Sequence, residues 1–172
     1  MTNRILIGYR GTGKTTLGRL LAARMGWAFI DADDEVERRA GKCIADIFAA
    51  AGETAVGDLE QEVVADLVSR QEHVISLGGG AILREDNRAA IRAGGGTVVW
   101  LTASPATIHA RLTSDASTRE RRPNLTAVGG LAEIEQLLTQ RDEFYRACAD
   151  VQVCTEDIPL DEVAARILTQ LS

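Results

Sequence analysis

The sequence has few aromatic residues and no excess of basic ones. Aromatic side chains make up 4% of its 172 residues, and 25 Asp and Glu outnumber 19 Lys and Arg, which gives a formal net charge of −6. General nucleic-acid binders are usually basic and stack aromatic side chains on bases. We therefore expect no nucleic-acid partner.

Long apolar runs and paired cysteines are missing as well. No stretch approaches the roughly 20 apolar residues that cross a bilayer, and the first residues lack a signal-peptide pattern, so we expect no membrane partner. The three cysteines, Cys43, Cys148 and Cys154, are odd in number and not spaced as metal ligands. That usage is typical of reduced thiols. We expect a cytoplasmic monomer that forms one domain over residues 1–172.

Short apolar runs alternate with stretches of helical periodicity. The runs lie at residues 4–8, 28–31, 73–77, 97–101 and 150–154. Strands separated by helices form parallel sheets covered on both faces. The pattern predicts a three-layer α/β/α fold with a five-stranded parallel sheet. Ser104 is expected to cap a helix, and the glycines at residues 94–96 to end one.

Residues 113–130 interrupt this pattern without an apolar period. The stretch contains one proline, two glycines and the charged run at residues 119–122. A long connection in a compact domain is often a functional lid, although a charge run can also be a solvated loop. We expect a mobile lid here.

The segment at residues 8–15, Gly-Tyr-Arg-Gly-Thr-Gly-Lys-Thr, matches the phosphate-loop pattern in full. An apolar run precedes it and an amphipathic stretch follows, as the motif requires. Glycines let backbone N–H groups converge on phosphate oxygens at the start of a helix. Lys14 would then reach the β- and γ-phosphates, and the Thr15 hydroxyl would bind Mg²⁺. The alternative is a glycine-rich turn with a chance Lys-Thr.

Two further motifs follow strands. Asp31 and Asp33 stand two apart after the second run, and in an extended segment their carboxylates would point to one side, toward a metal ion and a substrate hydroxyl. An acidic helix start explains them equally well. Gly78, Gly79 and Gly80 follow the third run and would let a ligand lie against backbone, although a tight turn is common at such sites.

Five blocks of the chain resemble the shikimate kinases, a family of small P-loop kinases. They are the segments 8–15, 31–33, 41–60 and 76–81, and Arg122-Pro123 followed by Arg141 and Tyr145. The most family-specific block is Ile-Ala-Asp-Ile-Phe at residues 44–48, followed by Gly52-Glu53. The resemblance spans nearly the whole chain, and it implies a P-loop kinase fold with a lid at about 113–130 and a substrate-binding region at about 32–60.

The resemblance implies an ATP-dependent kinase that uses Mg²⁺ and acts on a small hydroxy acid. The family converts shikimate and ATP into shikimate 3-phosphate and ADP in aromatic amino acid biosynthesis. The catalytic residues it implies are Lys14, Asp33 and Arg122, and those near the metal are Thr15 and Asp31. The implied ATP contacts are Gly11, Thr12, Gly13, Lys14, Thr15, Thr16, Arg111 and Arg122. The implied acceptor contacts are Asp33, Gly78, Gly79, Gly80 and Arg141.

The chain departs from the family at Val56-Gly57, where the family has Phe-Arg. In the family that arginine binds the substrate carboxylate together with the arginine at position 141. Hydrogen bonds to a charged group are worth about 1.5–3 kcal/mol, so its loss predicts at least a tenfold weaker hold on the acid. Asp142, Glu143 and Phe144 also depart, and add negative charge beside Arg141.

Three interpretations remain open. The chain is a shikimate kinase in which Arg10 or Arg38 supplies the missing cation, a kinase for another hydroxylated small molecule, or a nucleotide-binding relative with impaired catalysis. Asp33, Gly79 and Arg141 are all present, which favours the first.

Overall fold

A five-stranded parallel sheet forms the centre of the molecule in a computed structural model that describes residues 2–114 and 125–170. The strands are β1 (Arg4–Ile7), β2 (Ala28–Asp31), β3 (His73–Ser76), β4 (Thr97–Thr102) and β5 (Val151–Cys154). Their order across the sheet is β2-β3-β1-β4-β5, and every neighbouring pair is parallel. The prediction of five parallel strands is confirmed, with each strand within one residue of its expected ends.

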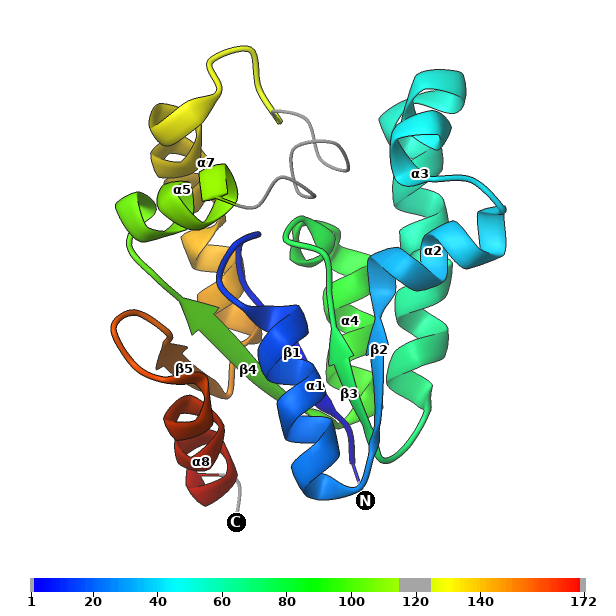
Figure 1. The fold of residues 1–172 in the computed structure, drawn as a ribbon. Coiled ribbons are helices and arrows are strands. Elements are labelled where there is room, and N and C mark those ends of the chain that lie inside the picture. The colour runs from blue at the N-terminus through cyan, green and yellow to red at the C-terminus, as the bar shows by residue number, and fades with distance from the viewer. Residues whose placement is uncertain (1, 115–124, 171–172) are drawn as a thin grey trace.

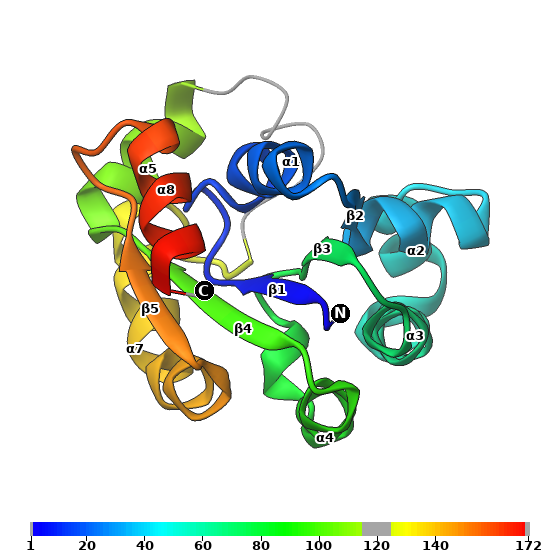
Figure 2. The same ribbon diagram turned by 90° about the horizontal axis from the view of Figure 1, so that it is seen from below.

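Helices cover both faces of the sheet, as Figure 2 shows. The elements are α1 (Lys14–Met25), α2 (Ala32–Ala40), α3 (Ile44–Ser69), the 3₁₀ turn η1 (Ala81–Leu83), α4 (Glu85–Gly94), α5 (Pro105–Ser114), α7 (Gly130–Cys148) and α8 (Leu160–Gln170). Helices α1 and α8 lie on one face, and α3, α4 and α7 lie on the other. The three-layer α/β/α architecture is confirmed.

The side chains of each strand alternate between the two faces of the sheet, so the molecule has two apolar cores. Ile5 and Ile7 of β1 are buried with the apolar residues of α3 and α4, whereas Leu6 between them is buried against α1 and α8. Side chains two apart in a strand point to the same face, so a continuous apolar run fills both cores at once.

The helix ends expected from the sequence form as predicted at two places. The Ser104 hydroxyl accepts a hydrogen bond from the Thr107 backbone N–H at 3.2 Å, which caps α5. Gly95 ends α4 with φ 63°, in the left-handed region that favours glycine. Helix α8 starts at Leu160, directly after Pro159, whose carbonyl accepts the first helical hydrogen bonds.

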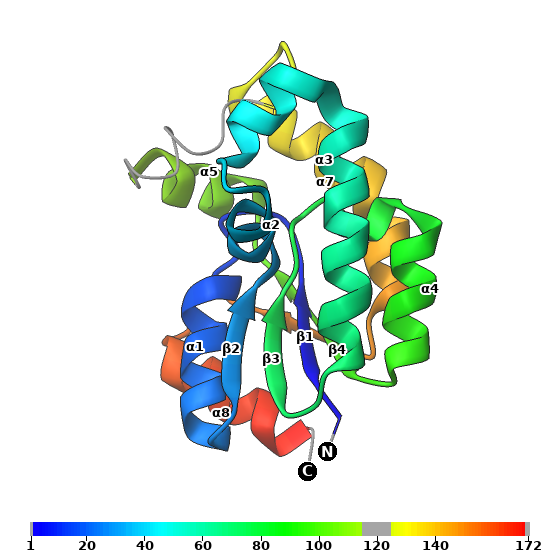
Figure 3. The same cartoon turned by 90° about the vertical axis from the view of Figure 1, so that its right-hand side faces the viewer.

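The carboxyl ends of the strands all face one end of the molecule, opposite the start of β1 and the end of α8 (Figure 1). The segments that follow β1, β2 and β3 therefore meet at this end. Figure 3 shows that α3 runs along the sheet and continues beyond the strand ends; Gly52, with φ 80° and ψ 179°, divides it into two helical parts. Within the described ranges, no helix has the length and apolar character needed to span a membrane.

The expected lid at 113–130 lies mostly outside the described residues, and so does Arg122. Both stay predictions.

Candidate active site

The segment after β1 has the backbone of a phosphate loop. Gly8, Gly11 and Gly13 have φ values of 140°, 80° and 95°, which side chains rarely adopt. A Cβ atom on Gly8 would lie 2.4 Å from the Leu101 carbonyl oxygen. Gly13 is the N-cap of α1, so the loop leads directly to the positive end of a helix, where anions bind. This geometry favours the phosphate loop over a chance turn.

Lys14 lies over this loop and is largely buried. Its Nζ donates hydrogen bonds to the carbonyl oxygens of Gly8 at 2.7 Å and Tyr9 at 3.0 Å. The side chain of Thr12 is buried and bonds the Tyr9 carbonyl at 2.7 Å, while Thr16 is exposed on the first turn of α1. The ammonium group is therefore held at the centre of the loop, where the phosphates of a nucleotide would lie.

Thr15 and Asp31 come together at the first turn of α1 and the end of β2. The Thr15 hydroxyl donates to Asp31 Oδ2 at 3.0 Å. These are two hard oxygen donors, and among the described residues no group of three or more His, Cys, Asp or Glu side chains could hold a metal ion. Mg²⁺ bound with phosphates characteristically takes only one or two protein oxygens and completes its shell with water. The pair fits such a site.

Asp31 and Asp33 do not lie in one extended segment, as the sequence suggested. Asp31 ends β2 and caps α2: its Oδ1 accepts a hydrogen bond from the Asp33 backbone N–H at 3.0 Å. Asp33 is in the first turn of α2, because the chain changes direction as soon as the carboxylate of Asp31 offers a cap. The two carboxylates therefore lie in different places: Asp31 is beside Thr15, and Asp33 lines the pocket expected to hold the acceptor.

A pocket of about 660 Å³ lies beyond the phosphate loop. Its lining includes the expected acceptor residues Asp33, Gly78, Gly79, Gly80 and Arg141, and also Arg10, Gly57, Glu60 and Arg84. A Cβ atom on Gly78 would lie 2.9 Å from both Asp33 Oδ1 and Glu60 Oε1. Glycine at this position lets both carboxylates approach the backbone.

Arg141 of α7 faces this pocket and is 9% exposed, which excludes the reading of an ordinary surface residue. A Cβ atom on Gly79 would lie 3.4 Å from its Nη1, so the guanidinium lies over the glycine run. Within the described part of the chain, its buried Nε has no hydrogen-bond partner. Tyr145, one turn further along α7, donates to the Gly79 carbonyl at 2.6 Å.

The negative residues after Arg141 do not line the pocket. Asp142 bonds Arg146 at 3.0 Å on the outer side of α7, and Glu143 is exposed. The effect of this added negative charge on the pocket is therefore weakened, because Asp142 is paired and Glu143 is solvated.

Arg111 of α5 lies against the phosphate loop. Its Nη1 donates to the Gly11 carbonyl at 3.2 Å and to Thr155 Oγ1 at 3.1 Å, and its Nη2 donates to the Thr155 carbonyl at 2.8 Å. The sequence did not predict this connection between the loop and the end of β5. Contact of Arg111 with ATP stays a prediction.

The two residues considered as replacements for the missing cation are both engaged elsewhere. Arg38 bonds Glu35 on the exposed side of α2, at 2.7 and 2.8 Å. Arg10 lines the pocket, but its Nη2 forms a 3.0 Å ion pair with the buried carboxylate of Glu133.

Sequence reasoning missed Arg84 and gave no role to Glu60. Burial raises the pKa of Glu60, and the charges of Arg84 and Arg141 offset part of that rise. Glu60 ends the block 41–60 and Arg84 lies outside the blocks that carry the resemblance; their approach depends on how α3 packs against the loop after β3, which no local pattern shows.

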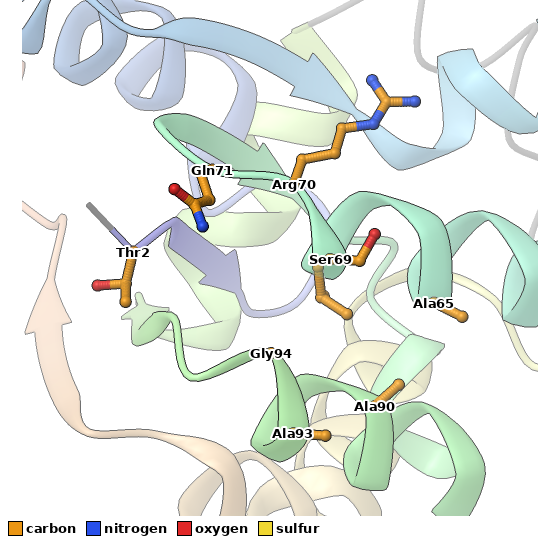
Figure 4. A pocket seen from close by; sticks show the side chains of 9 residues that line it. Thr2, Ala65, Ser69, Arg70, Gln71, Ala90, Ala93 and Gly94 are labelled. Carbon is orange, nitrogen blue, oxygen red and sulfur yellow. The ribbon is translucent and has the colours of Figure 1, made fainter.

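A second hollow, of about 520 Å³, lies at the opposite end of the sheet (Figure 4). The end of α3, the end of α4 and Thr2 form its wall. Of the described residues that line it, Arg70 alone is charged, and it pairs with Asp66 at 2.8 Å. Its wall offers little for catalysis, so the pocket beside the phosphate loop is the candidate active site.

Comparison with known proteins agrees with this geometry. Residues 10–172 match the model of the shikimate kinase family. A shikimate kinase from Rhodopirellula baltica is 44% identical over 163 residues, which cover 95% of this chain and 87% of the relative. One from Symbiobacterium thermophilum is 43% identical over 169 residues, 98% of this chain and 95% of the relative.

The chain belongs to the shikimate kinase family. Among solved structures, shikimate kinase from Acinetobacter baumannii in complex with shikimate has a TM-score of 0.91 and 34% identity, covering 99% of this chain and 93% of that one. The enzyme from Aquifex aeolicus has a TM-score of 0.82 at 34% identity, covering 99% of this chain and 96% of that one. As a shikimate kinase family member, this chain is an ATP-dependent phosphotransferase that acts on an alcohol group, and ATP is its co-substrate.

Proposed function

We propose that this protein transfers the γ-phosphoryl group of ATP to a hydroxyl of shikimate, forming shikimate 3-phosphate and ADP for aromatic amino acid biosynthesis. The observation that carries the proposal is one pocket, adjoining the phosphate loop, whose lining includes both the carboxylate of Asp33 and the guanidinium of Arg141. A polyhydroxylated acid needs a carboxylate that accepts its hydroxyl protons and a cation that binds its own carboxylate. A related shikimate kinase has been solved in complex with shikimate.

In this proposal the chain mainly positions charges. Lys14 Nζ exchanges its carbonyl partners in the loop for the β- and γ-phosphate oxygens, while backbone N–H groups from Gly11 to Thr16 hold the phosphates. Asp33 orients the acceptor hydroxyl and takes its proton. The backbone of Gly78–80 and Arg141 hold the rest of the acceptor.

Thr15 and Asp31 would hold Mg²⁺, the hydroxyl directly and the carboxylate in the outer shell. The ion supplies charge neutralisation at the transferring phosphoryl group when it is bound. Arg111 adds a contact with ATP. Arg122 would close over the phosphates from a lid at 113–130, excluding water as a competing acceptor.

The proposal also includes a single domain over residues 1–172, a monomeric state and a cytoplasmic location. The three cysteines are free thiols in the structure, which fits a reducing compartment.

The test is an ADP-release assay with ATP, Mg²⁺ and a panel of acceptors: shikimate, its neutral methyl ester, other cyclic hydroxy acids and simple sugars. Turnover stimulated by shikimate at millimolar concentration or below supports the proposal. Stimulation only by another alcohol would assign a different acceptor. ATP binding without acceptor-dependent turnover would indicate a relative with impaired catalysis.

A further inference from the structure

Arg84 occupies the space in front of Gly57. It stands between η1 and α4, at the N-cap of α4. A Cβ atom on Gly57 would lie 2.3 Å from Arg84 Nη2 and 2.6 Å from its Cζ. Since real Cβ atoms do not approach other atoms this closely, no side chain can extend from position 57 while Arg84 is in place. The glycine makes room for a guanidinium that comes from another part of the chain.

Three hydrogen bonds to α3 fix the orientation of this guanidinium. Nη1 donates to Asp58 Oδ1 at 2.8 Å and to Gln61 Oε1 at 3.1 Å. Nη2 makes one long hydrogen bond, at 3.4 Å, to the Thr54 carbonyl. Within the part of the chain that the structure describes, Nε donates none. The edge formed by Nε and Nη2 lies beside Gly57, where a Cβ atom would be 2.8 Å and 2.3 Å from the two nitrogens. Because position 57 has no side chain, this edge keeps the donors that bind a carboxylate through two parallel hydrogen bonds.

Arg84 and Arg141 line the same pocket, with Glu60 as a common neighbour. Arg84 comes from the loop after β3, and Arg141 comes from α7. The two guanidiniums thus come from two different elements. Arg84 is also ion-paired with Asp58, but this pair is formed through Nη1, at 2.8 Å, and the carboxylate of Asp58 is exposed. The lining also contains acidic residues, Asp34, Glu37 and Glu53 among them, so a substrate carboxylate would be held by direct hydrogen bonds to the two guanidiniums and not by the net charge of the pocket.

We propose that Arg84 binds the carboxylate of the acceptor together with Arg141, and so takes the place of the arginine that the resemblance implies at position 57. The inference rests on the proposed function, because it assumes an acidic acceptor in this pocket. The other nearby cations are less suited. Arg10 is paired with a carboxylate that is 1% exposed, whereas the carboxylate paired with Arg84 is 64% exposed and its attraction is screened by solvent. Arg38 lies outside the lining.

The first experiment compares Arg84→Ala with Arg92→Ala. Arg92 is a matched control on α4, exposed and paired with Glu85 at 2.7 Å. Losing the hydrogen bonds to a carboxylate predicts that Arg84→Ala raises the KM and the Kd for shikimate at least about tenfold. The KM for ATP is expected to stay unchanged, and Arg92→Ala to behave as the wild type. A change in shikimate KM and Kd of less than twofold in Arg84→Ala would overturn the proposal.

A purely structural role is separated by removing the charge from the substrate. Shikimate methyl ester keeps the ring and the hydroxyls but has no carboxylate. In Arg84→Ala, the preference in kcat/KM for shikimate over the ester is expected to fall about tenfold. An equal loss for both acceptors would show that Arg84 only supports α3, and would contradict the proposal.

The second experiment exchanges the positions. Gly57→Arg alone forces two guanidiniums into one space and is expected to lower the melting temperature. Gly57→Arg combined with Arg84→Ala is expected to recover most of the affinity for shikimate. A double variant no better than Arg84→Ala would contradict the idea that the two positions serve one carboxylate. If Arg84→Ala fails to fold, Arg84→Lys keeps the charge and loses the fork, and is expected to weaken shikimate binding but not ATP binding; unchanged shikimate binding by that variant would oppose the proposal.

Different results would contradict the proposed function and the role of Arg84. If the wild type neither binds nor phosphorylates shikimate, the proposed function is wrong. If the wild type uses shikimate and Arg84→Ala does so equally well, only the role of Arg84 is wrong.

Discussion

The hydroxyl of Tyr145 donates a 2.6 Å hydrogen bond to the carbonyl oxygen of Gly79, 66 residues away in sequence. Tyr145 is fully buried and stacks on Trp100, with ring centroids 5.5 Å apart. The bond joins α7, which carries Arg141, to the glycine run that forms the floor of the acceptor pocket. The distance between α7 and the glycine run is therefore set by a buried side chain as well as by the loop.

Tyr145→Phe keeps the ring and removes this bond. A carbonyl that loses its buried donor costs about 1–3 kcal/mol, so we expect a lower free energy of unfolding by that amount and a higher KM for shikimate. Urea unfolding and steady-state kinetics measure the two effects. A variant as stable as the wild type would show that water replaces the phenol.

The buried phenol of Tyr145 also predicts that the free energy of unfolding depends on pH. Burial raises the pKa of Tyr145 from 10.0 to about 12. A raised pKa means that the neutral phenol stabilises the folded state below pH 10.0, and that this stabilisation is lost as the pH rises toward about 12. The stability difference between wild type and Tyr145→Phe should stay constant up to pH 10.0 and narrow above it. A difference that narrows already between pH 7 and 9 would contradict a raised pKa.

Thr15→Ala tests the metal site. The variant loses one hard oxygen donor near Asp31, so we expect a higher Mg²⁺ concentration for half-maximal activity and a kcat reduced about tenfold or more. Thr15→Ser keeps the hydroxyl and is expected to need little more Mg²⁺ than the wild type. Both variants should melt at the temperature of the wild type without ligand, because Thr15 is exposed. Equal Mg²⁺ requirements for Ala and Ser would remove Thr15 from the site.

Gly78→Ala tests the approach of the two carboxylates to the backbone. Its Cβ would lie 2.9 Å from both Asp33 Oδ1 and Glu60 Oε1, so at least one must move. Displacement of a reacting group by about 1 Å can cost 100-fold, and we expect kcat to fall at least tenfold with the Kd for ATP unchanged. Gly80→Ala is the comparison, because its Cβ would meet Leu83 at 3.8 Å, an ordinary contact. Similar losses in both variants would contradict the explanation.

Thr155→Val tests how Arg111 affects ATP. Thr155 Oγ1 donates to the Thr12 carbonyl at 2.9 Å and accepts from Arg111, so it ties β5 to the phosphate loop without being an expected ATP contact. If Arg111 acts by bracing the loop, Thr155→Val raises the KM for ATP about threefold to tenfold. Thr139→Val, which removes an exposed hydrogen bond within α7, is the control. An effect of Arg111→Ala that Thr155→Val does not share would favour direct contact with the nucleotide.

The sheet and the phosphate loop could be predicted because their signals are local. A strand buried on both faces is a short apolar run, and a phosphate loop needs its glycines and lysine in one segment. Asp31 shows where such reasoning ends: two acidic residues two apart fit a strand or a helix start, and only the hydrogen bond to the Asp33 backbone decides between them. The contact of Arg84 with Gly57 could not be predicted, since it depends on a long side chain crossing between elements 27 positions apart in sequence.

Gly78 and Arg84 belong to the same connection between β3 and α4, whereas Lys14 and Thr15 follow β1, the neighbouring strand. In the proposed reaction, the loop after β1 holds the phosphates of ATP, and the connection after β3 supplies part of the acceptor site beside Asp33 and Arg141. A lineage could change the acceptor through substitutions confined to one short segment and keep its hold on ATP intact. With the binding cation at Arg84, in the connection between β3 and α4, and not at position 57 of α3, selection for a new acceptor can act on that connection as a unit.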